Sequence, residues 1–302
     1  MRQIGVWPRP TVPDALHPWL FGDPAQRSFA LLDAARIRFL PERLRQSGLP
    51  HACLFDGTTA EDLADTAPWL VELADGNDFT RSLFTRGDAH RDLWDAEAGV
   101  FLRSPLPLHE VRAHLRKLTR LCDEEGEWFY LRFCDPLYAR HLLTHGSEEM
   151  RARLLRSGPM MMRGPQDGQM LIWTPPAQPD DLAPRRALLL RVQDRQALKL
   201  ARLESFTTRM IAWLTEAYGP LPEQIDTPHF VGQLVLHGQD QLGLTNERQV
   251  ADYVAASWLL RTPAERVLDF TPIGHEIPQA TLERIHDEAY EISRKSAHVR
   301  VS

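Results

Sequence analysis

The stretch WFYLRFCDP, residues 128–136, joins a strand signal directly to a helix signal. Aromatic and apolar residues of the kind enriched in strands fill residues 128–133, and we interpret these aromatic side chains as core. Asp135-Pro136 predicts the end of that strand and the start of a helix, because proline is well tolerated at the first helical position. The acidic segment 123–127 before the strand is interpreted as a solvated turn.

The same alternation continues through the first half of the chain. Expected strands cover residues 28–32, 51–55, 99–103, 160–163 and 169–174, and residues 69–73 are a further apolar run. Expected helices cover residues 41–46, 59–67, 77–84, 108–121, 136–143 and 148–155. The last two strands are separated by glycine and proline, which predicts a hairpin. Short strands that alternate with helices indicate an α/β amino-terminal lobe.

Proline-rich segments divide the chain. Residues 1–26 contain five prolines, so we expect an irregular or polyproline-like arm there, and PPAQPDDLAP at residues 175–184 is a clear linker signal. After Gln193 the apolar residues recur at helical spacing, which predicts an all-α carboxyl-terminal lobe with four helices. The predicted organisation is an arm at 1–26, an α/β domain at 27–175, a linker at 176–192 and a helical domain at 193–302.

Composition excludes several classes of protein. The 302 residues include 35 basic and 41 acidic ones, and the net charge of −6 offers no general electrostatic reason to bind nucleic acid or an anionic membrane. No apolar stretch approaches the roughly 18 residues of a membrane span, and no signal peptide is visible. Cys53, Cys122 and Cys134 are widely spaced, which fits reduced thiols. We therefore expect a cytoplasmic protein without a membrane or nucleic-acid partner.

One loop resembles a catalytic motif. Leu54-Phe55-Asp56-Gly57-Thr58 is similar to the nucleophile loop of haloacid-dehalogenase-like phosphatases, in which a first Asp attacks phosphorus and a second acts as acid and base. Leu54 stands at the position of the nucleophile, so the attacking group is absent. A strand followed by a tight turn at Asp56-Gly57 explains the sequence more simply. A degenerate hydrolase remains an alternative.

No metal or cofactor site emerges from the spacing of histidines and glycines. His109 and His114 are five residues apart, so about 100° per residue turns them away from each other on a helix. His141 and His145 have the favourable spacing, but no third ligand has diagnostic spacing. Nucleophile-elbow, phosphate-loop and dinucleotide-binding motifs are missing from the sequence. We expect a binding protein with no cofactor and no metal, not an enzyme.

Five sequence blocks carry a family resemblance that covers about half of the chain. They lie at residues 30–36, 49–58, 67–73, 99–104 and 129–136. In this order they resemble a bacterial domain family of unknown function that contains the effector chaperones, or adaptors, of the type VI secretion system. Two positions depart from that pattern. Cys134 stands where we expect an aromatic residue, and Leu137 where the family often has Arg.

The resemblance implies a non-catalytic protein that binds a toxic type VI effector and helps deliver it to the VgrG spike protein or its PAAR tip. A structural component of the secretion apparatus is a further alternative. Within the resemblance, Asp33, Asp56, Arg132 and Asp135 stand out. Structural roles, as turn residues, helix caps or members of buried ion pairs, would explain these four residues as well as contacts with a partner would. The candidate partner-binding residues are Trp7, Trp19, Asp33, Asp56, Arg132 and Asp135.

Overall fold

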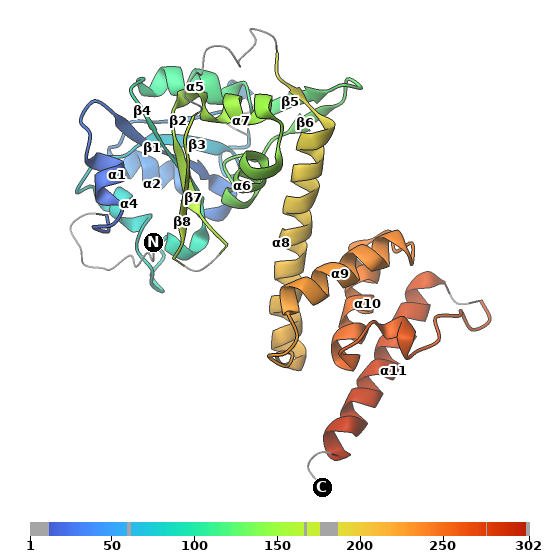
Figure 1. Cartoon of the computed structure of the whole chain (residues 1–302). Coiled ribbons are helices and arrows are strands. Elements are labelled where there is room, and N and C mark those ends of the chain that lie inside the picture. Colours follow the sequence, from blue (N-terminus) through green and yellow to red (C-terminus); the bar gives the residue numbers. More distant parts are fainter. Residues whose placement is uncertain (1–11, 59–61, 166–167, 176–186, 276, 300–302) are drawn as a thin grey trace. The chain divides into compact units, whose positions relative to one another are not determined.

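The chain forms two compact units, Met1–Ala201 and Arg202–Ser302. The structure, a computed structural model, describes residues 12–58, 62–165, 168–175, 187–275 and 277–299 (Figure 1). The first unit mixes strands with short helices and the second is helical, as the sequence predicts. The division falls within helix α8 (Val192–Tyr218). Residues 176–186 of the predicted linker, and the start of the helix predicted at 59–67, lie outside the described residues.

A six-stranded sheet organises the first unit. Its strands are β1 (Arg27–Asp33), β2 (His51–Cys53), β3 (Pro68–Glu72), β4 (Gly99–Ser104), β7 (Met160–Arg163) and β8 (Met170–Trp173). They follow the order β2-β3-β1-β4-β7-β8, and every neighbouring pair is antiparallel. The predicted hairpin of residues 160–163 and 169–174 is the pair β7 and β8. Five of the six strands coincide with strands expected from the sequence, and β3 overlaps the apolar run at residues 69–73.

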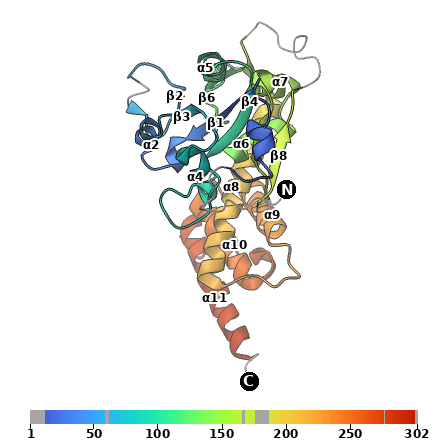
Figure 2. The same cartoon turned by 90° about the vertical axis from the view of Figure 1, so that its left-hand side faces the viewer.

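Helices cover both faces of this sheet. Alternate residues of β1 enter different cores, with Phe29 and Leu31 in one and Ala30 and Leu32 in the other. The first core also contains residues of α5 (Leu108–Arg116), α6 (Pro136–His145) and α7 (Glu148–Leu154), and the second contains residues of α1 (His17–Phe21), α2 (Leu40–Ser47) and α4 (Asp78–Ser82) (Figure 2). Antiparallel sheets often have one solvated face, which shows as alternating polarity. Burial of both faces explains why β1 is apolar without alternation.

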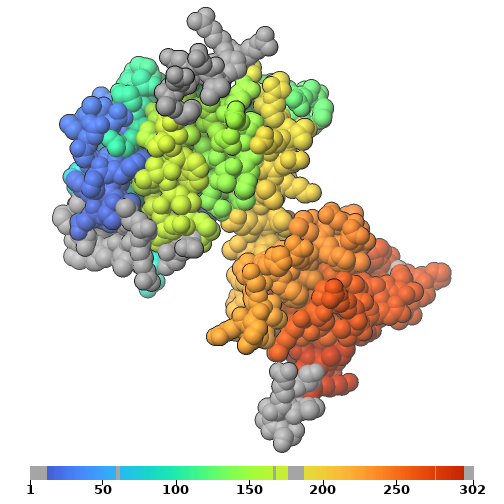
Figure 3. Space-filling model, viewed as in Figure 1, coloured from blue at the N-terminus to red at the C-terminus, as the bar shows by residue number. Residues whose placement is uncertain are grey.

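A second, three-stranded sheet follows α5. It consists of β5 (Arg120–Asp123), β6 (Trp128–Tyr130) and β9 (Leu189–Leu190), in the order β6-β5-β9. The hairpin of β5 and β6, green in Figure 3, lies at the surface of the unit. Its turn is the predicted one, with Gly126 at a φ of 92°. Asp123 is buried there and accepts the backbone N–H groups of Glu125 and Glu127 at 3.0 and 2.9 Å.

The helix predicted for residues 108–121 is too long. α5 ends at Arg116, and residues 120–123 form β5 instead. Thr119 closes the helix end by donating its hydroxyl hydrogen to the carbonyl oxygen of Arg116 at 2.8 Å. The prediction was wrong because Leu115, Leu118 and Leu121 are spaced like a helix face, whereas β5 is held by pairing with β6 and β9.

The proline-rich segment packs on its own unit where the structure describes it. Residues 12–26 contain the short helix α1, with Pro18 in its first turn. Val12, Leu16 and Leu20 are almost fully buried in the core that α2 and α4 share. The irregular arm expected for residues 1–26 is therefore wrong for residues 17–21, because a helix of one turn fits between the prolines. Residues 1–11 lie outside the described residues.

The second unit contains the later part of α8 together with α9 (Thr227–Asp240), α10 (Glu247–Leu260) and α11 (Pro278–Val299). These are the four helices predicted from the sequence. Their core includes Leu214, Val231, Val254 and Ile285, all at most 1% exposed. Among the described residues, no helix is both long enough and apolar enough to cross a bilayer.

Candidate functional site

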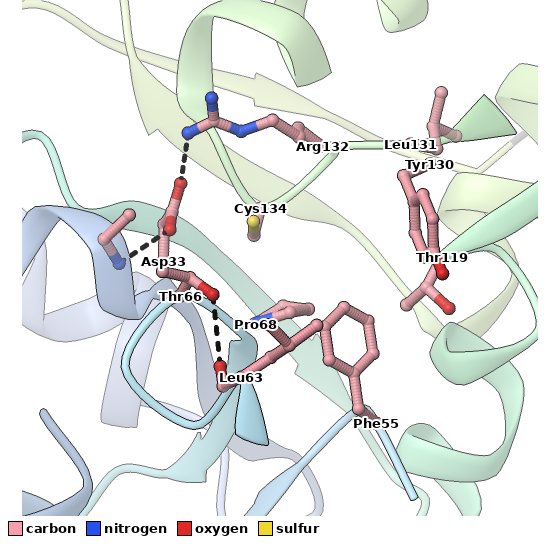
Figure 4. A pocket seen from close by; sticks show the side chains of 11 residues that line it. Asp33, Phe55, Leu63, Thr66, Pro68, Thr119, Tyr130, Leu131, Arg132 and Cys134 are labelled. Carbon is pink, nitrogen blue, oxygen red and sulfur yellow. Dashed lines mark hydrogen bonds and ion pairs between the residues drawn. The ribbon is translucent and has the colours of Figure 1, made fainter. Parts of the chain in front are cut away.

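A pocket of about 390 Å³ opens in the first unit beside the β5–β6 hairpin (Figure 4). We call it the aromatic pocket. Its walls come from the end of β1, the loop after β2, the turn before β3, the hairpin and the turn before α6. The residues that line it are Asp33, Ala35, Phe55, Leu63, Thr66, Pro68, Thr119, Tyr130, Leu131, Arg132 and Cys134.

Two ion pairs join the turn after β1 to the turn before α6, and Asp33 and Arg132 of the first pair line the pocket. The Asp33 carboxylate accepts a hydrogen bond from Arg132 Nη2 at 2.7 Å, and the Asp135 carboxylate accepts one from Arg36 Nη2 at 2.9 Å. Both carboxylates are only 2% exposed. Buried carboxylates need such partners, since an unpaired charge in the interior is costly. The structure thus brings together three predicted site residues, Asp33, Arg132 and Asp135, and adds Arg36.

The same carboxylates cap short helices. Asp33 accepts the backbone N–H of Ala35 at 3.0 Å at the start of the 3-10 turn η1 (Ala34–Arg36). Asp135 accepts the backbone N–H of Leu137 at 2.9 Å at the start of α6, as Asp135-Pro136 predicts. Capping leaves one oxygen of each carboxylate for its arginine. The structural duties expected for these residues are therefore present, and partner contact by them stays a prediction.

Arg132 supplies a fixed cation at the edge of the pocket. Burial alone would lower its pKa, but the carboxylates of Asp33 and Asp135 outweigh burial and raise the pKa above its usual value. The side chain is still 54% exposed. Because a guanidinium has five N–H donors, Arg132 retains donors for a further acceptor while it is bound to Asp33.

Cys134 is a small, inert side chain of the pocket wall. It is 5% exposed, and burial together with the nearby carboxylates of Asp33 and Asp135 raises the pKa of its thiol well above the usual value. The thiol is therefore neutral at physiological pH and a poor nucleophile. An aromatic side chain, which the resemblance leads us to expect at residue 134, would take up space that the pocket leaves open here.

The opposite wall is aromatic (Figure 4). Phe55 and Tyr130 form an edge-to-face pair with ring centroids 6.4 Å apart, and Tyr130 is 65% exposed. The interpretation of the aromatic run as core is wrong for Trp128 and Tyr130, which lie on the exposed face of β6, whereas Phe129 packs against the core. Successive side chains of a strand point to opposite faces, but residues 128–130 are all aromatic, so no change of polarity in the sequence separates them.

Asp56 lies outside the lining of the pocket but holds the loop that carries Phe55. Its carboxylate forms ion pairs with Arg112 and Arg116 of α5. Arg112 also donates to the backbone carbonyl oxygens of Cys53 at 2.7 Å and Phe55 at 3.2 Å. Asp56 therefore acts on the pocket through the position of Phe55.

Of the two tryptophans predicted as partner contacts, Trp19 is not among the described residues that line the pocket. Trp19 is half-buried in α1 and packs against the core, and the guanidinium of Arg103 lies 5.8 Å from the centroid of its ring. Trp7 lies outside the described residues. Nothing in the structure tests Trp19 as a contact residue.

The lining of the pocket determines which chemical groups it can accommodate. Apolar and aromatic walls suit an apolar side chain, and Arg132 suits a carbonyl or carboxylate beside it. In the described part of the chain, no group of three or more His, Cys, Asp or Glu side chains is arranged to hold a metal ion. Sequence reasoning missed Phe55, Leu63 and Tyr130 as neighbours of one cavity, because they come from segments that are far apart in the chain.

Comparison with known proteins gives one match. Residues 28–153 match the model of a family described as Domain of unknown function (DUF4123). No curated protein and no solved structure matches the chain significantly. The matched segment contains every residue that lines the aromatic pocket. From within β1 to within α7, the chain is therefore similar to the family described as Domain of unknown function (DUF4123).

Proposed function

We propose that the protein is a type VI secretion effector chaperone, or adaptor. It binds one cognate toxic effector in the cytoplasm and helps to load it onto the VgrG spike protein and its PAAR tip. The observation that carries this proposal is the family match over residues 28–153, because that family is associated with type VI effector adaptors.

The aromatic pocket supplies a contact site for the effector. In this proposal, an apolar side chain of the effector packs between Phe55 and Tyr130, and a neighbouring acceptor binds the free N–H groups of Arg132. Exposed tyrosine and arginine beside a pocket are the residue types that dominate binding energy in protein interfaces. The ion pairs of Asp33 and Asp135 fix the pocket wall before the effector arrives, which lowers the entropy lost on binding.

The geometry around Asp56 supports a non-catalytic role. Leu54, at the position of the phosphatase nucleophile, is fully buried. Asp56 forms ion pairs with two arginines of α5. We therefore propose that this loop shapes the pocket and does not transfer phosphate.

The proposal is tested by purifying the tagged full chain from its native cell while the type VI system is active. We expect one toxin and a VgrG-type spike protein to co-purify. Tyr130→Ala should reduce the yield of the toxin, whereas Phe39→Ala, which removes an equally exposed aromatic ring (61%) outside the pocket, should not. Absence of both partners would overturn the proposal. Phosphate-ester hydrolysis that is lost in Asp56→Asn would instead establish the hydrolase.

A further inference from the structure

A second pocket, of about 420 Å³, is strongly basic. We call it the basic pocket. Leucines are among the residues that line it, and its polar lining comes from α5 and the residue after it, β5, α7 and the 3-10 turn η3 (Leu155–Ser157). No Asp or Glu is among the described residues that line it. The side chains that define its character are His114, Lys117, Arg120, Trp128, Arg153 and Arg156.

Three cations of this pocket, Lys117, Arg120 and Arg156, differ from the paired arginines on the same unit. Lys117, Arg120 and Arg156 are exposed and form no ion pair with any residue that the structure describes. By contrast, Arg191 pairs with Glu124 at 2.8 Å and Arg195 with Asp123. Several like charges around one cavity favour the entry of an anionic group.

The pKa of His114 is affected by the positive charges around it. Its Nε2 lies 2.7 Å from the backbone carbonyl oxygen of Arg153, and its ring is partly buried. Burial lowers the pKa of His114, and the charges of Arg156, Arg153 and Lys117 lower it further, although the bond to the carbonyl opposes this shift. The pocket therefore holds a neutral imidazole among cations.

Helix termini explain part of this arrangement but not all of it. Lys117 follows the last turn of α5 and Arg153 lies in the last turn of α7, where cations offset the negative end of the helix dipole. Arg120 belongs to a strand, so this explanation does not apply to it. Its guanidinium lies 4.6 Å from the Trp128 ring centroid and 5.9 Å from that of Tyr130.

Arg120, Trp128 and Tyr130 connect the two pockets. Trp128 lines the basic pocket, Tyr130 lines the aromatic pocket, and both rings lie on the exposed face of β6. Two residues along a strand span about 6–7 Å, a distance that a short extended segment of a partner matches. One segment is therefore able to reach both pockets over the hairpin.

We propose that the basic pocket binds an acidic segment of the effector, and this inference rests on the proposed function. Carboxylates of that segment pair with Lys117, Arg120 and Arg156, while an adjacent apolar side chain enters the aromatic pocket. Charge complementarity favours an acidic segment as the ligand of the basic pocket. Its cations are on long side chains distributed around the cavity, so they can pair with several carboxylates. Arg156 lies beyond the segment matched by the family model, so part of the basic pocket is not covered by that match.

The test uses the full chain and a fluorescein-labelled peptide with a leucine followed by a run of glutamates. Fluorescence anisotropy should show binding that weakens with added salt, and about tenfold weaker binding when the glutamates are glutamines. The triple variant Lys117→Gln, Arg120→Gln, Arg156→Gln should bind the glutamate peptide about tenfold more weakly. The triple variant Arg38→Gln, Lys199→Gln, Arg202→Gln makes the same change in net charge at exposed sites outside the pocket and should bind normally.

Three outcomes would overturn the inference. These are an equal loss in both triple variants, equal binding of the two peptides, or inorganic phosphate that saturates the pocket when the peptide does not bind. All six substituted side chains are exposed, so both triple variants should fold normally. Circular dichroism and urea unfolding check that they do.

The same variants separate this inference from the proposed function. If the pocket variant co-purifies with the toxin and spike as well as the wild type does, the acidic segment is excluded and the chaperone function stands. If the wild type co-purifies with neither partner, the chaperone function fails, and the peptide titration alone decides the chemistry of the pocket.

Discussion

Asp33 and Arg132 are 99 residues apart in the chain and meet at 2.7 Å. Arg36 and Asp135 repeat the relationship at 2.9 Å, with the same separation and the charges exchanged. Because the second pair is displaced by three residues on both segments, the turn after β1 and the turn before α6 are joined at two points. These two contacts hold one wall of the aromatic pocket.

Removing the guanidinium of this contact should destabilise the fold moderately. We expect Arg132→Gln to lower the free energy of unfolding by about 1–3 kcal/mol, because it leaves the buried Asp33 carboxylate with its capping contact alone. The loss stays below that of a fully buried pair, since Arg132 is half-exposed and screened by water. Urea denaturation measures the change.

The matched control is Arg45→Gln. Arg45 pairs with Glu42 at 2.7 Å on the surface of α2, with side chains that are 66% and 45% exposed. Such pairs contribute little, so the change should stay below about 0.5 kcal/mol. Equal losses in the two variants would show that the Asp33–Arg132 contact has no special structural role.

Filling the aromatic pocket from within should block partner binding. Cys134→Phe places a ring where the small thiol leaves the pocket open, so we expect loss of toxin co-purification. Extra volume in a packed wall commonly costs about 1–3 kcal/mol, which urea unfolding would detect separately. Cys134→Ala keeps the pocket open and should co-purify the toxin normally. Normal toxin yield in a folded Cys134→Phe protein would remove the pocket from the binding site.

The thiol of Cys134 should resist alkylation in the native protein. Burial and the neighbouring carboxylates raise its pKa, so almost no thiolate is present at mildly alkaline pH. Iodoacetamide followed by mass spectrometry should label Cys122, which is half-buried, before Cys134. In urea all three cysteines should react alike. Rapid native labelling of Cys134 would contradict the buried position assigned to it.

Acid should destabilise the β5–β6 hairpin through Asp123. Burial alone would raise the pKa of Asp123, but the N–H groups of Glu127 and Glu125 and the guanidinium of Arg195 hold it below its ordinary value. A carboxyl whose pKa is lower when folded stabilises the fold above its unfolded pKa of about 3.9 and loses this effect as pH falls through the folded pKa.

Asp123→Asn should therefore flatten the pH dependence of the free energy of unfolding below about pH 4. Unfolding in urea at a series of pH values checks this. Asp287→Asn changes a carboxylate that is 86% exposed. In this variant the free energy of unfolding should depend on pH below about pH 4 as it does in the wild type. If the pH dependence in Asp123→Asn equals that of the wild type, the Asp123 carboxylate does not contribute to the loss of stability in acid.

Local signals were enough to predict most of the fold. Asp135 caps α6, as Asp135-Pro136 predicts, and the apolar runs mark the strands of the large sheet. The errors lie where tertiary pairing decides. Residues 120–121 fit a helical pattern but pair as a strand, and Trp128 and Tyr130 resemble core residues but lie on an exposed face.

The candidate site was only partly visible in the sequence. Asp33, Arg132 and Asp135 were nominated individually, but their contacts join segments 99 residues apart, a relationship that local patterns do not encode. No sequence motif pointed to Arg36 as a site residue. The basic pocket was missed because its cations come from two helices, a turn and a strand, and the chain as a whole is acidic.

The most direct test compares the proteins secreted by cells with and without this chain. Quantitative mass spectrometry of the medium should show that one toxic effector is lost when the chain is deleted and restored when the full chain is supplied. The other effectors and the spike should be secreted at wild-type levels. Loss of every effector would identify a structural component of the apparatus, and an unchanged set of secreted effectors would contradict an effector chaperone.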